Sequence, residues 1–374
     1  MVAYWQNAGK VIRFSNKMFN KLFSAFSYDV GIDLGTANTL VWVKDKGIVI
    51  REPSVVAMHK KTKKIIAIGS EAKRMVGKTP ATIETIRPIL GGVIADFDAT
   101  AAMISHYIQL VHEVGHVLPT AWSRPRVVIG IPSAVTEVER RAVWEAALNA
   151  GAREAFLIEE PMAAAIGENI SIFLPTGVMI VDIGGGTTEI AIISLGGIVV
   201  GKSLKLAGDD MDRAISHYIR FRHGLLIGDK TSEELKIKIG SAYQVQKKEN
   251  GETHQDRMAV VRGRDIETGL PKSLRITEVE VREALSPVLT KIIDAIGDLL
   301  EEAPPELTSD ILEHGVLLTG GGSLLPGFDA LISERTHIPV IRSEDPLTSV
   351  VRGAGKVLQD AALLSRVKVI GGLK

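Results

Sequence analysis

Residues 182–189 read DIGGGTTE and lie between two apolar runs, 178–181 and 190–193, that are typical of β-strands. The three glycines at 184–186 allow close backbone approach and unusual dihedral angles, which a turn needs if its N–H groups are to surround phosphate oxygens. Because β-branched residues resume directly after this stretch, the turn connects two strands and does not open a helix. No GKS or GKT stands at the spacing after these glycines that a Walker P-loop would require. The stretch therefore predicts a phosphate-binding hairpin.

The same pattern recurs early in the chain, where residues 33–39 read DLGTANT between strand-like flanks. Asp33 corresponds to Asp182, and Gly35 corresponds to Gly184. Two Asp-apolar-Gly hairpins, one early and one near the middle of the chain, suggest a duplicated domain. We expect its halves to face each other across a nucleotide, with each half holding the phosphates from one side.

The composition is that of an ordinary globular protein. The chain has 374 residues, 45% hydrophobic and 24% charged, which suits two or three domains with substantial cores. The 44 acidic and 44 basic residues balance, so nothing in the net charge indicates nucleic-acid binding. The absence of cysteine excludes disulfides and thiolate metal sites, and the histidines lack partners at ligand spacing. No apolar run reaches the roughly 18 residues that span a bilayer.

The N-terminal extension, residues 1–28, has no acidic residue before Asp29. On a helical wheel, residues 10–26 separate into a basic face and an apolar face, as in helices that lie in the plane of a membrane surface. Each Lys or Arg near an anionic surface contributes about 1 kcal/mol. A helix docked on its own domain and a segment disordered until a partner binds are the alternatives. The apolar face consists of Val11, Ile12, Phe14, Met18, Phe19, Leu22, Phe23, Ala25 and Phe26, and the basic face of Lys10, Arg13, Lys17 and Lys21.

A second candidate membrane contact follows a helix expected at 99–114. Residues 116–122 read HVLPTAW and should form a loop that displays Leu118 and Trp122. Such a loop is either packed against the domain or inserted into a membrane as a wedge. The basic residues at 60–64 are better interpreted as a soluble hairpin tip than as a lipid contact.

Two adjacent acids, Glu159 and Glu160, follow a strand expected at 156–158 and precede a helix with Pro161 in its first turn. A carboxylate fixed there beside the phosphates could orient and polarise a water for in-line attack on the γ-phosphorus. A Glu at a helix N-terminus also stabilises the helix dipole. Local sequence leaves both roles open.

Glu233 and Lys236 share one face of a helix expected at 231–243, where they either contact ribose and adenine or form an i,i+3 surface ion pair. The glycines at 320–322 follow a strand at 316–319 and should precede a helix that begins at Leu324 and directs its N-terminal amides at a ligand.

Two further helices contain unusual residues. The amphipathic helix at 278–300 is expected to be interrupted near Pro287. The helix-like tail at 346–364 contains Gly353 and Gly355, which suit close packing of two backbones, as at a hinge between lobes.

These motifs resemble the actin, Hsp70 and sugar-kinase ATPase superfamily, and within it the MreB family of bacterial actin homologues. The resemblance runs from Asp29 to about Leu364. It rests on GIDLGTANTLV, EPSVVA, GKTPATI, RPRVVIGIPS, VERRAV, LIEEPMAAAIG, DIGGGTTEIA, AGDDMD, GLPKSL, LTGGGSLLPG and IRSEDPLTSVVRGAG.

The resemblance implies an α/β, actin-like ATPase fold with two lobes, each built on a duplicated ribonuclease-H-like core, and four subdomains. The expected division is a membrane-targeting extension at 1–28, lobe I at 29–170 and 341–374, and lobe II at 171–340. Subdomain IB is expected at about 62–96 and subdomain IIB at about 209–275. The extension is longer than in many relatives of this kind.

The resemblance also implies roles for individual residues. Glu160 and Thr187 match the pair that positions the hydrolytic water, and Asp33 and Asp182 should face Mg²⁺ through water. The implied ATP contacts are Thr36, Ala37, Asn38, Gly184, Gly185, Gly186, Glu233, Glu234, Leu235, Lys236, Gly322, Ser323, Leu324 and Leu325.

The implied function is weak ATP hydrolysis coupled to the assembly of double filaments. These would be cytoplasmic, lie on the inner face of the cell membrane, and direct rod shape and cell-wall elongation together with membrane proteins of the elongation machinery. A small-molecule kinase would need an inserted acceptor module, and an Hsp70-type chaperone a peptide-binding domain; we expect neither here. An actin-fold ATPase scaffold that stays at the membrane without polymerising is the main alternative.

Overall fold

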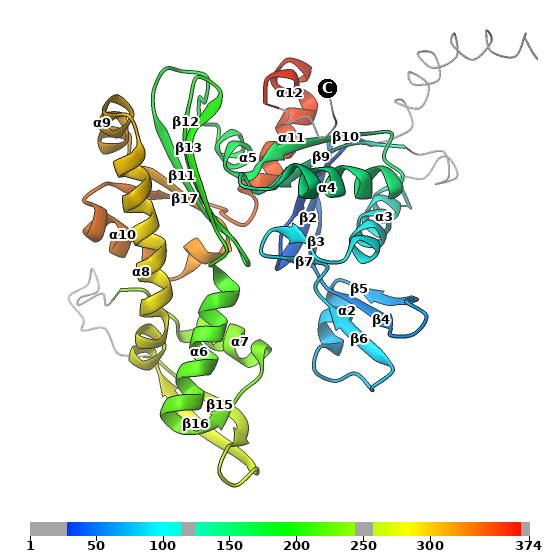
Figure 1. The fold of residues 1–374 in the computed structure, drawn as a ribbon, viewed down its shortest axis with the longest axis vertical. Helices are drawn as coiled ribbons and strands as arrows, with labels where there is room; N and C mark the ends of the chain where they lie inside the picture. Colours follow the sequence, from blue (N-terminus) through cyan, green and yellow to red (C-terminus); the bar gives the residue numbers. More distant parts are fainter. Residues whose placement is uncertain (1–27, 114–123, 244–256, 368–374) are drawn as a thin grey trace, which may run out of the picture.

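The computed structural model describes residues 28–113, 124–243 and 257–367, which form two lobes side by side (Figure 1). Each lobe contains a five-stranded sheet. The first sheet consists of β1 (Val30–Leu34), β2 (Asn38–Val43), β3 (Gly47–Pro53), β9 (Arg126–Ile131) and β10 (Glu154–Glu159). The second consists of β11 (Val178–Ile183), β12 (Thr188–Ser194), β13 (Gly197–Leu204), β17 (Val316–Thr319) and β18 (Val340–Arg342).

The two sheets share one topology. The first has the order β10-β9-β1-β2-β3, and the second, counted from its parallel edge, has the order β18-β17-β11-β12-β13. In each, the first strand of a hairpin lies parallel to its neighbour on one side and antiparallel to the second hairpin strand. The hairpin partners Asp33↔Leu40 and Asp182↔Glu189 occupy equivalent registers. The duplication predicted from the sequence is confirmed.

Two helices, α5 (Glu160–Gly167) and α11 (Ser349–Gln359), lie between the sheets and share a buried apolar cluster with strands of both. Their backbones touch: a methyl group on Gly353 would overlap the carbonyl oxygen of Ala163, and one on Gly167 would overlap that of Ser349. The predicted close packing of two backbones is confirmed. The tail is not a single helix, because α11 ends before Asp360 and α12 (Ala361–Val367) follows.

The outer helices cover the opposite sides of the sheets (Figure 1). On the first sheet these are α3 (Phe97–Glu113) and α4 (Glu137–Asn149). The start of α4 has a capping box, in which Thr136 and Glu139 bond reciprocally. On the second sheet they are α8 (Glu278–Glu302) and α9 (Pro305–His314).

Helix α8 is continuous, so the predicted interruption near Pro287 is wrong. Pro287 lies on the exposed face, where water can satisfy the carbonyl that loses its N–H partner. The opposite face, with Leu285, Val288 and Leu289, is buried. Burial of that face outweighs the loss of one helical hydrogen bond.

The helix expected from Leu324 also begins later. After β17 the chain forms a 3₁₀ turn, Gly321–Leu324, and α10 (Phe328–Thr336) starts only after Pro326 and Gly327. Gly327 has φ 76, a left-handed conformation that a continuous helix cannot contain.

Smaller sheets extend both lobes. Next to the first sheet lie β4 (Val56–His59), β5 (Ile65–Ile68), β6 (Ile83–Ile86) and α2 (Ser70–Met75), with a short hairpin of β7 (Ile89–Leu90) and β8 (Val93–Ile94). The lysines at 60–64 occupy the exposed β4–β5 tip, as predicted. Next to the second sheet lie α6 (Gly208–His223), α7 (Asp229–Ile239), β14 (Leu225–Leu226), β15 (Met258–Asp265) and β16 (Pro271–Thr277).

The proposed membrane contacts lie outside the described residues, both in the N-terminal extension and at Leu118 and Trp122. Within the described ranges, no helix has the length and apolar character needed to cross a bilayer.

Candidate functional site

A cavity of 410 Å³ lies between the two lobes, a volume within the usual range for small-molecule sites. It is lined by the turns of both glycine-rich hairpins, by the start of α5, by α6 and α7, and by the 3₁₀ turn after β17. The sequence-predicted residues among its lining are Asp33, Thr36, Ala37, Asn38, Glu160, Asp182, Gly184, Gly185, Gly186, Thr187, Glu233, Lys236, Gly322, Leu324 and Leu325.

The two hairpin turns face each other closely. A Cβ atom on Gly185 would lie 2.5 Å from Ala37 Cβ, and one on Gly186 would lie 2.6 Å from Thr36 Oγ1. The second turn is closed by a hydrogen bond of 2.8 Å from Gly184 N to the Thr187 carbonyl. Side chains on these glycines would fill the space between the turns, so glycine keeps the backbone accessible to a ligand.

Three residues with carboxyl groups line the cavity, namely Asp33, Asp182 and Glu160. Burial raises the pKa of Asp33 to about 7. Burial, and then the neighbouring charges of Asp33 and Glu189, raise the pKa of Asp182 to about 8. The pKa of Glu160 is also raised well above its ordinary value, first by burial and then by Glu189, Asp33 and Asp182. A buried cluster of like charges favours protons or cations.

This arrangement fits a magnesium ion that is held largely by other ligands. Within the described residues, no three acidic or histidine side chains are placed to hold a metal by themselves. Mg²⁺ usually keeps several waters and binds through one or two carboxylates together with substrate phosphates. Asp33 and Asp182 lie on equivalent strands beside the facing turns, as that mode of binding needs.

Glu160 and Thr187 approach the cavity from different sheets. Glu160 is the first residue of α5, directly after β10, and Thr187 ends the β11–β12 turn. Thr187 is 7% exposed, and both residues line the cavity. Either could therefore contact a water next to a bound phosphate. The structure brings together the pair that the resemblance assigned to hydrolysis.

The i,i+3 ion pair between Glu233 and Lys236 does not form. Lys236 Nζ instead lies 2.9 Å from Asp212 Oδ1 and donates to the Gly208 carbonyl at 2.8 Å. Glu233 Oε2 lies 2.9 Å from Lys73 Nζ of α2. Both residues border the cavity, which agrees with a contact to ribose and adenine. The alternative, an ion pair between Glu233 and Lys236 on the surface, is excluded.

Three predicted contact residues do not line the cavity. Glu234 is exposed and pairs with Lys230 at 3.6 Å. Leu235 is buried in the core of the second lobe, and the Ser323 hydroxyl donates to the Gly320 carbonyl at 2.6 Å. A four-residue helical segment necessarily directs some side chains away from any one ligand.

The cavity also has residues that the sequence did not single out as ligand contacts. Asp209 and Asp212 line it, although acids at a helix start are usually dipole partners. Burial raises the pKa of Asp212 to about 6, against the opposing effect of Lys236. Asp209 Oδ2 lies 2.6 Å from Arg87 Nη1, so this ion pair and Lys73–Glu233 both cross between the lobes. Because the partners of each ion pair lie far apart in the chain, no local sequence pattern predicts these two pairs.

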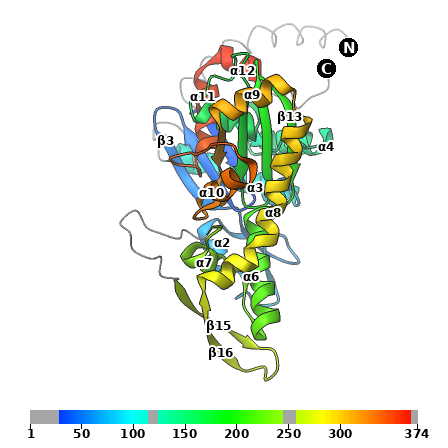
Figure 2. The same cartoon turned by 90° about the vertical axis from the view of Figure 1, so that its left-hand side faces the viewer.

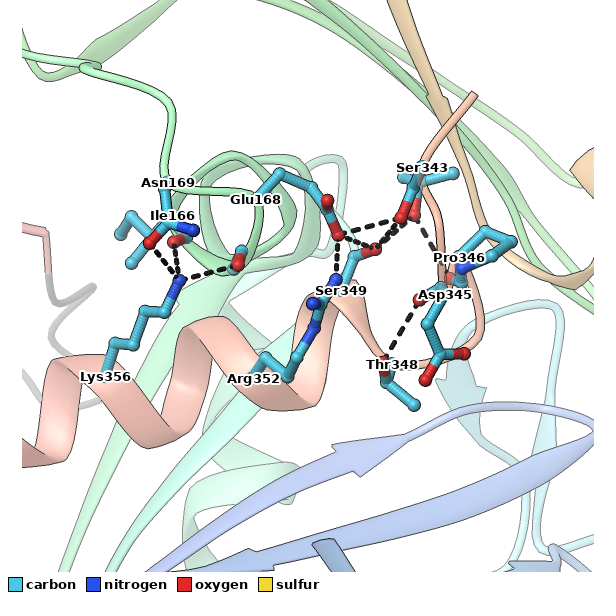
Figure 3. Close-up of polar contacts among 12 residues, drawn as sticks. Ile166, Glu168, Asn169, Ser343, Asp345, Pro346, Thr348, Ser349, Arg352 and Lys356 are labelled. Atoms are coloured by element: carbon cyan, nitrogen blue, oxygen red, sulfur yellow. Dashed lines mark hydrogen bonds and ion pairs between the residues drawn. The ribbon is translucent and has the colours of Figure 1, made fainter. Parts of the chain in front are cut away.

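A polar network lies at the junction between α5 and α11 (Figure 3). Glu168 Oε1 accepts hydrogen bonds from Ser343 Oγ at 2.9 Å and Ser349 Oγ at 2.6 Å, and also from Arg352. Lys356 Nζ donates to the carbonyls of Ile166 and Gly167 at 2.9 and 2.6 Å, which caps the end of α5.

This network reaches the cavity through β17. The Thr319 hydroxyl donates to Ser349 Oγ at 2.7 Å, and Gly320 N donates to the Pro346 carbonyl at 3.0 Å. Gly320 and Pro346 both line the cavity. Ser343 follows β18 of the second sheet, so Glu168 ties that sheet to the helices between the lobes.

The duplicated sheets with facing hairpin turns define an actin-like protein. MreB5 of Spiroplasma citri bound to ADP has a TM-score of 0.82 and 38% identity, and the match covers 91% of this chain and 98% of that one. The MamK double helical filament, at 23% identity and a TM-score of 0.71, shares the fold over 89% of this chain and 99% of its own.

A family model described as MreB/Mbl protein matches residues 27–366. The chain belongs to the MreB/Mbl family. It is 49% identical over 346 residues to the cell shape-determining protein MreB of Escherichia coli (strain K12), covering 91% of this chain and 96% of that protein. It is 45% identical over 344 residues to the cell shape-determining protein Mbl of Bacillus subtilis (strain 168), covering 92% and 99%.

Proposed function

We propose that this chain is an ATP-binding and ATP-hydrolysing cytoskeletal protein that forms membrane-associated filaments and directs rod shape and cell-wall elongation. The observation that carries the proposal is the convergence of both glycine-rich turns, Glu160 and Thr187 on one cavity. The relatives in E. coli and B. subtilis are named for cell-shape determination, and the MreB5 neighbour was solved with ADP and with AMPPNP.

The proposed chemistry assigns separate tasks to the two lobes. The turn at 35–38 and the turn at 184–187 hold the phosphates from opposite sides through backbone N–H groups and the Thr36 hydroxyl. Glu160 and Thr187 orient a water for attack on the terminal phosphorus. When bound, Mg²⁺ neutralises charge on the phosphates, and Asp33 and Asp182 would hold it through water. Lys236 and the turn at 321–325 border the adenosine side.

Self-assembly is supported by opposite charge at the two ends of the second lobe, where β15 and β16 lie at one end and α9 at the other (Figure 2). The exposed face of β15 and β16 presents Arg262, Arg264 and Arg275 beside Met258 and Val260, which are 61% and 60% exposed. At the other end of the lobe, the last residues of α8 and the helix α9 present exposed acids beside Leu312, namely Glu301, Glu302, Glu306 and Glu313. Complementary patches at opposite ends produce an open head-to-tail filament.

Reversal of charge on the β15 end should weaken assembly. We expect Arg262→Glu with Arg264→Glu to raise the protein concentration needed for ATP-dependent sedimentation by about tenfold or more, since like charges then meet across the contact. Adding Glu302→Arg and Glu306→Arg to the same chain should restore part of the lost assembly. Arg141→Glu, an exposed residue of α4, is the matched control and should sediment as the wild type. A wild-type protein that stays monomeric with ATP and lipid in all solution conditions contradicts the filament proposal and favours the non-polymerising scaffold.

Membrane association is proposed from the N-terminal extension and the loop containing Leu118 and Trp122. Deletion of residues 1–27 should strongly reduce flotation with anionic liposomes, because it removes the apolar face and four cations worth about 1 kcal/mol each near such a surface. The binding that remains should depend on Trp122 and change little with salt. A chain with Lys10, Arg13, Lys17 and Lys21 changed to Gln should lose the salt-dependent part alone. Equal flotation with and without the extension would place the anchor elsewhere.

A further inference from the structure

Glu189, the last residue of the DIGGGTTE stretch, is a buried acid that does not line the cavity. It lies in β12, two residues after Thr187, and is 1% exposed. The strand register places it opposite Asp182 on one side and opposite Ser203 of β13 on the other. Side chains at paired positions share a face of the sheet. Glu189 therefore lies next to Asp182 on the same face, but outside the cavity that Asp182 lines.

The Glu189 carboxylate is held by donors from both sheets. Its Oε2 accepts hydrogen bonds from Ser133 N at 3.1 Å and Ser133 Oγ at 2.6 Å. Its Oε1 accepts a hydrogen bond from Ser203 Oγ at 2.5 Å. Ser203 belongs to the second sheet, whereas Ser133 follows β9 of the first. The bonds to Ser133 therefore join the two sheets.

This connection between Glu189 and Ser133 lies close to Glu160 and Thr187, the residues assigned to hydrolysis. A Cβ atom on Gly92 would lie 2.6 Å from Pro132 Cγ and 3.0 Å from Thr187 Cγ2, so the residue before Ser133 and Thr187 both lie next to Gly92. The charge of Glu189 is also the largest electrostatic influence on the pKa of Glu160 after burial. Glu160 itself directly follows β10, and β10 pairs with β9, the strand that precedes Ser133.

The two hydrolytic residues come from different sheets, so their separation depends on how the sheets are held together. Glu160 directly follows β10, which pairs with β9, whereas Thr187 lies in the turn between β11 and β12. Hydrogen bonds to a buried carboxylate are charge-assisted and directional, and they fix distance more tightly than apolar contacts. A displacement of about 1 Å between catalytic groups can reduce turnover by about 100-fold.

We propose that Glu189 is a positioning residue for ATP hydrolysis: by binding Ser133 it fixes the Glu160 carboxylate of one lobe relative to the Thr187 hydroxyl of the other. The proposal rests on the proposed ATPase function. It assigns Glu189 no contact with the nucleotide, so its loss should affect turnover and leave nucleotide binding in place.

Two serines that donate to the same carboxylate provide a matched pair of variants. Ser133→Ala removes a bond between the sheets, and Ser203→Ala removes a bond within one sheet. We expect Ser133→Ala to lower kcat for Mg²⁺-ATP about tenfold with KM within about twofold, as for one lost charge-assisted hydrogen bond. Ser203→Ala should stay within about twofold of wild type for both constants.

Glu189→Gln and the double variant complete the test. Glu189→Gln should lower kcat at least as much as Ser133→Ala, and adding Ser133→Ala to it should cause little further loss, because both variants weaken the same contact between Glu189 and Ser133. Equal kcat in Ser133→Ala and Ser203→Ala overturns the positioning role, as does a change confined to KM. If Ser133→Ala and Ser203→Ala both have the kcat of the wild type while Glu160→Ala has a lower kcat, only this inference fails. If the wild-type protein neither binds nor hydrolyses ATP, the proposed function fails with it.

Discussion

Glu160→Ala is expected to reduce the rate of phosphate release by about 100-fold at saturating Mg²⁺-ATP, within the range for loss of a group that positions or polarises a reacting water. Glu160 is the first residue of α5, and it lines the same cavity as Thr187 of the other lobe. Because the proposed phosphate contacts are backbone groups of the two turns and not the Glu160 side chain, the affinity for ATP should change little. Single-turnover phosphate release and titration with a fluorescent ATP analogue measure the two quantities separately.

Glu159→Ala is the matched control for this prediction. Glu159 is the neighbouring carboxylate, it ends β10, and it does not line the cavity. Its replacement should leave turnover within about twofold of wild type. Wild-type turnover in Glu160→Ala would remove Glu160 from the mechanism, and equal losses in both variants would point to a structural effect on the start of α5.

Gly353→Ala is expected to lower the free energy of unfolding by about 3 kcal/mol, at the upper end of the usual cost of overpacking. The added methyl group would overlap the Ala163 carbonyl, where α5 and α11 touch backbone to backbone. One helix must move to admit it, and α5 carries Glu160, so ATP turnover should fall as well. Urea unfolding followed by circular dichroism measures the stability change.

Gly297→Ala is the opposite case and the control. Gly297 lies inside α8, and a Cβ atom there would meet nothing within 4 Å. Alanine should stabilise the helix by about 0.5–1 kcal/mol by lowering the entropy of the unfolded chain. If Gly353→Ala is as stable as wild type, the close backbone contact between α5 and α11 is not needed for the fold.

Local sequence was sufficient for much of the site. The glycine-rich hairpins and the strand-to-helix junction at Glu160 each depend on residues close together in the chain. Their backbone geometry follows from glycine dihedrals, β-branched runs and the proline in the first turn of α5, all of which act over a few residues. These elements were predicted at nearly the positions where they occur.

Predictions failed where long-range packing outweighed a local signal. Pro287 favours a break, yet α8 continues because its other face is buried across the second lobe. Spacing alone left open an ion pair between Glu233 and Lys236, whereas in the structure Glu233 pairs with Lys73 and Lys236 pairs with Asp212. Lys73 lies 160 residues from its partner in the chain. No local pattern contains that information.

The two Asp-apolar-Gly hairpins can be recognised from local residues alone, because their dihedral and strand preferences act over a few positions. The packing of the two lobes is what makes these hairpins face each other and places Glu189 outside the cavity, bound to Ser133, 56 residues earlier in the chain. The physical reason is that burial and charge pairing depend on which surfaces meet. Those surfaces exist only after two sheets of the same topology have packed around α5 and α11.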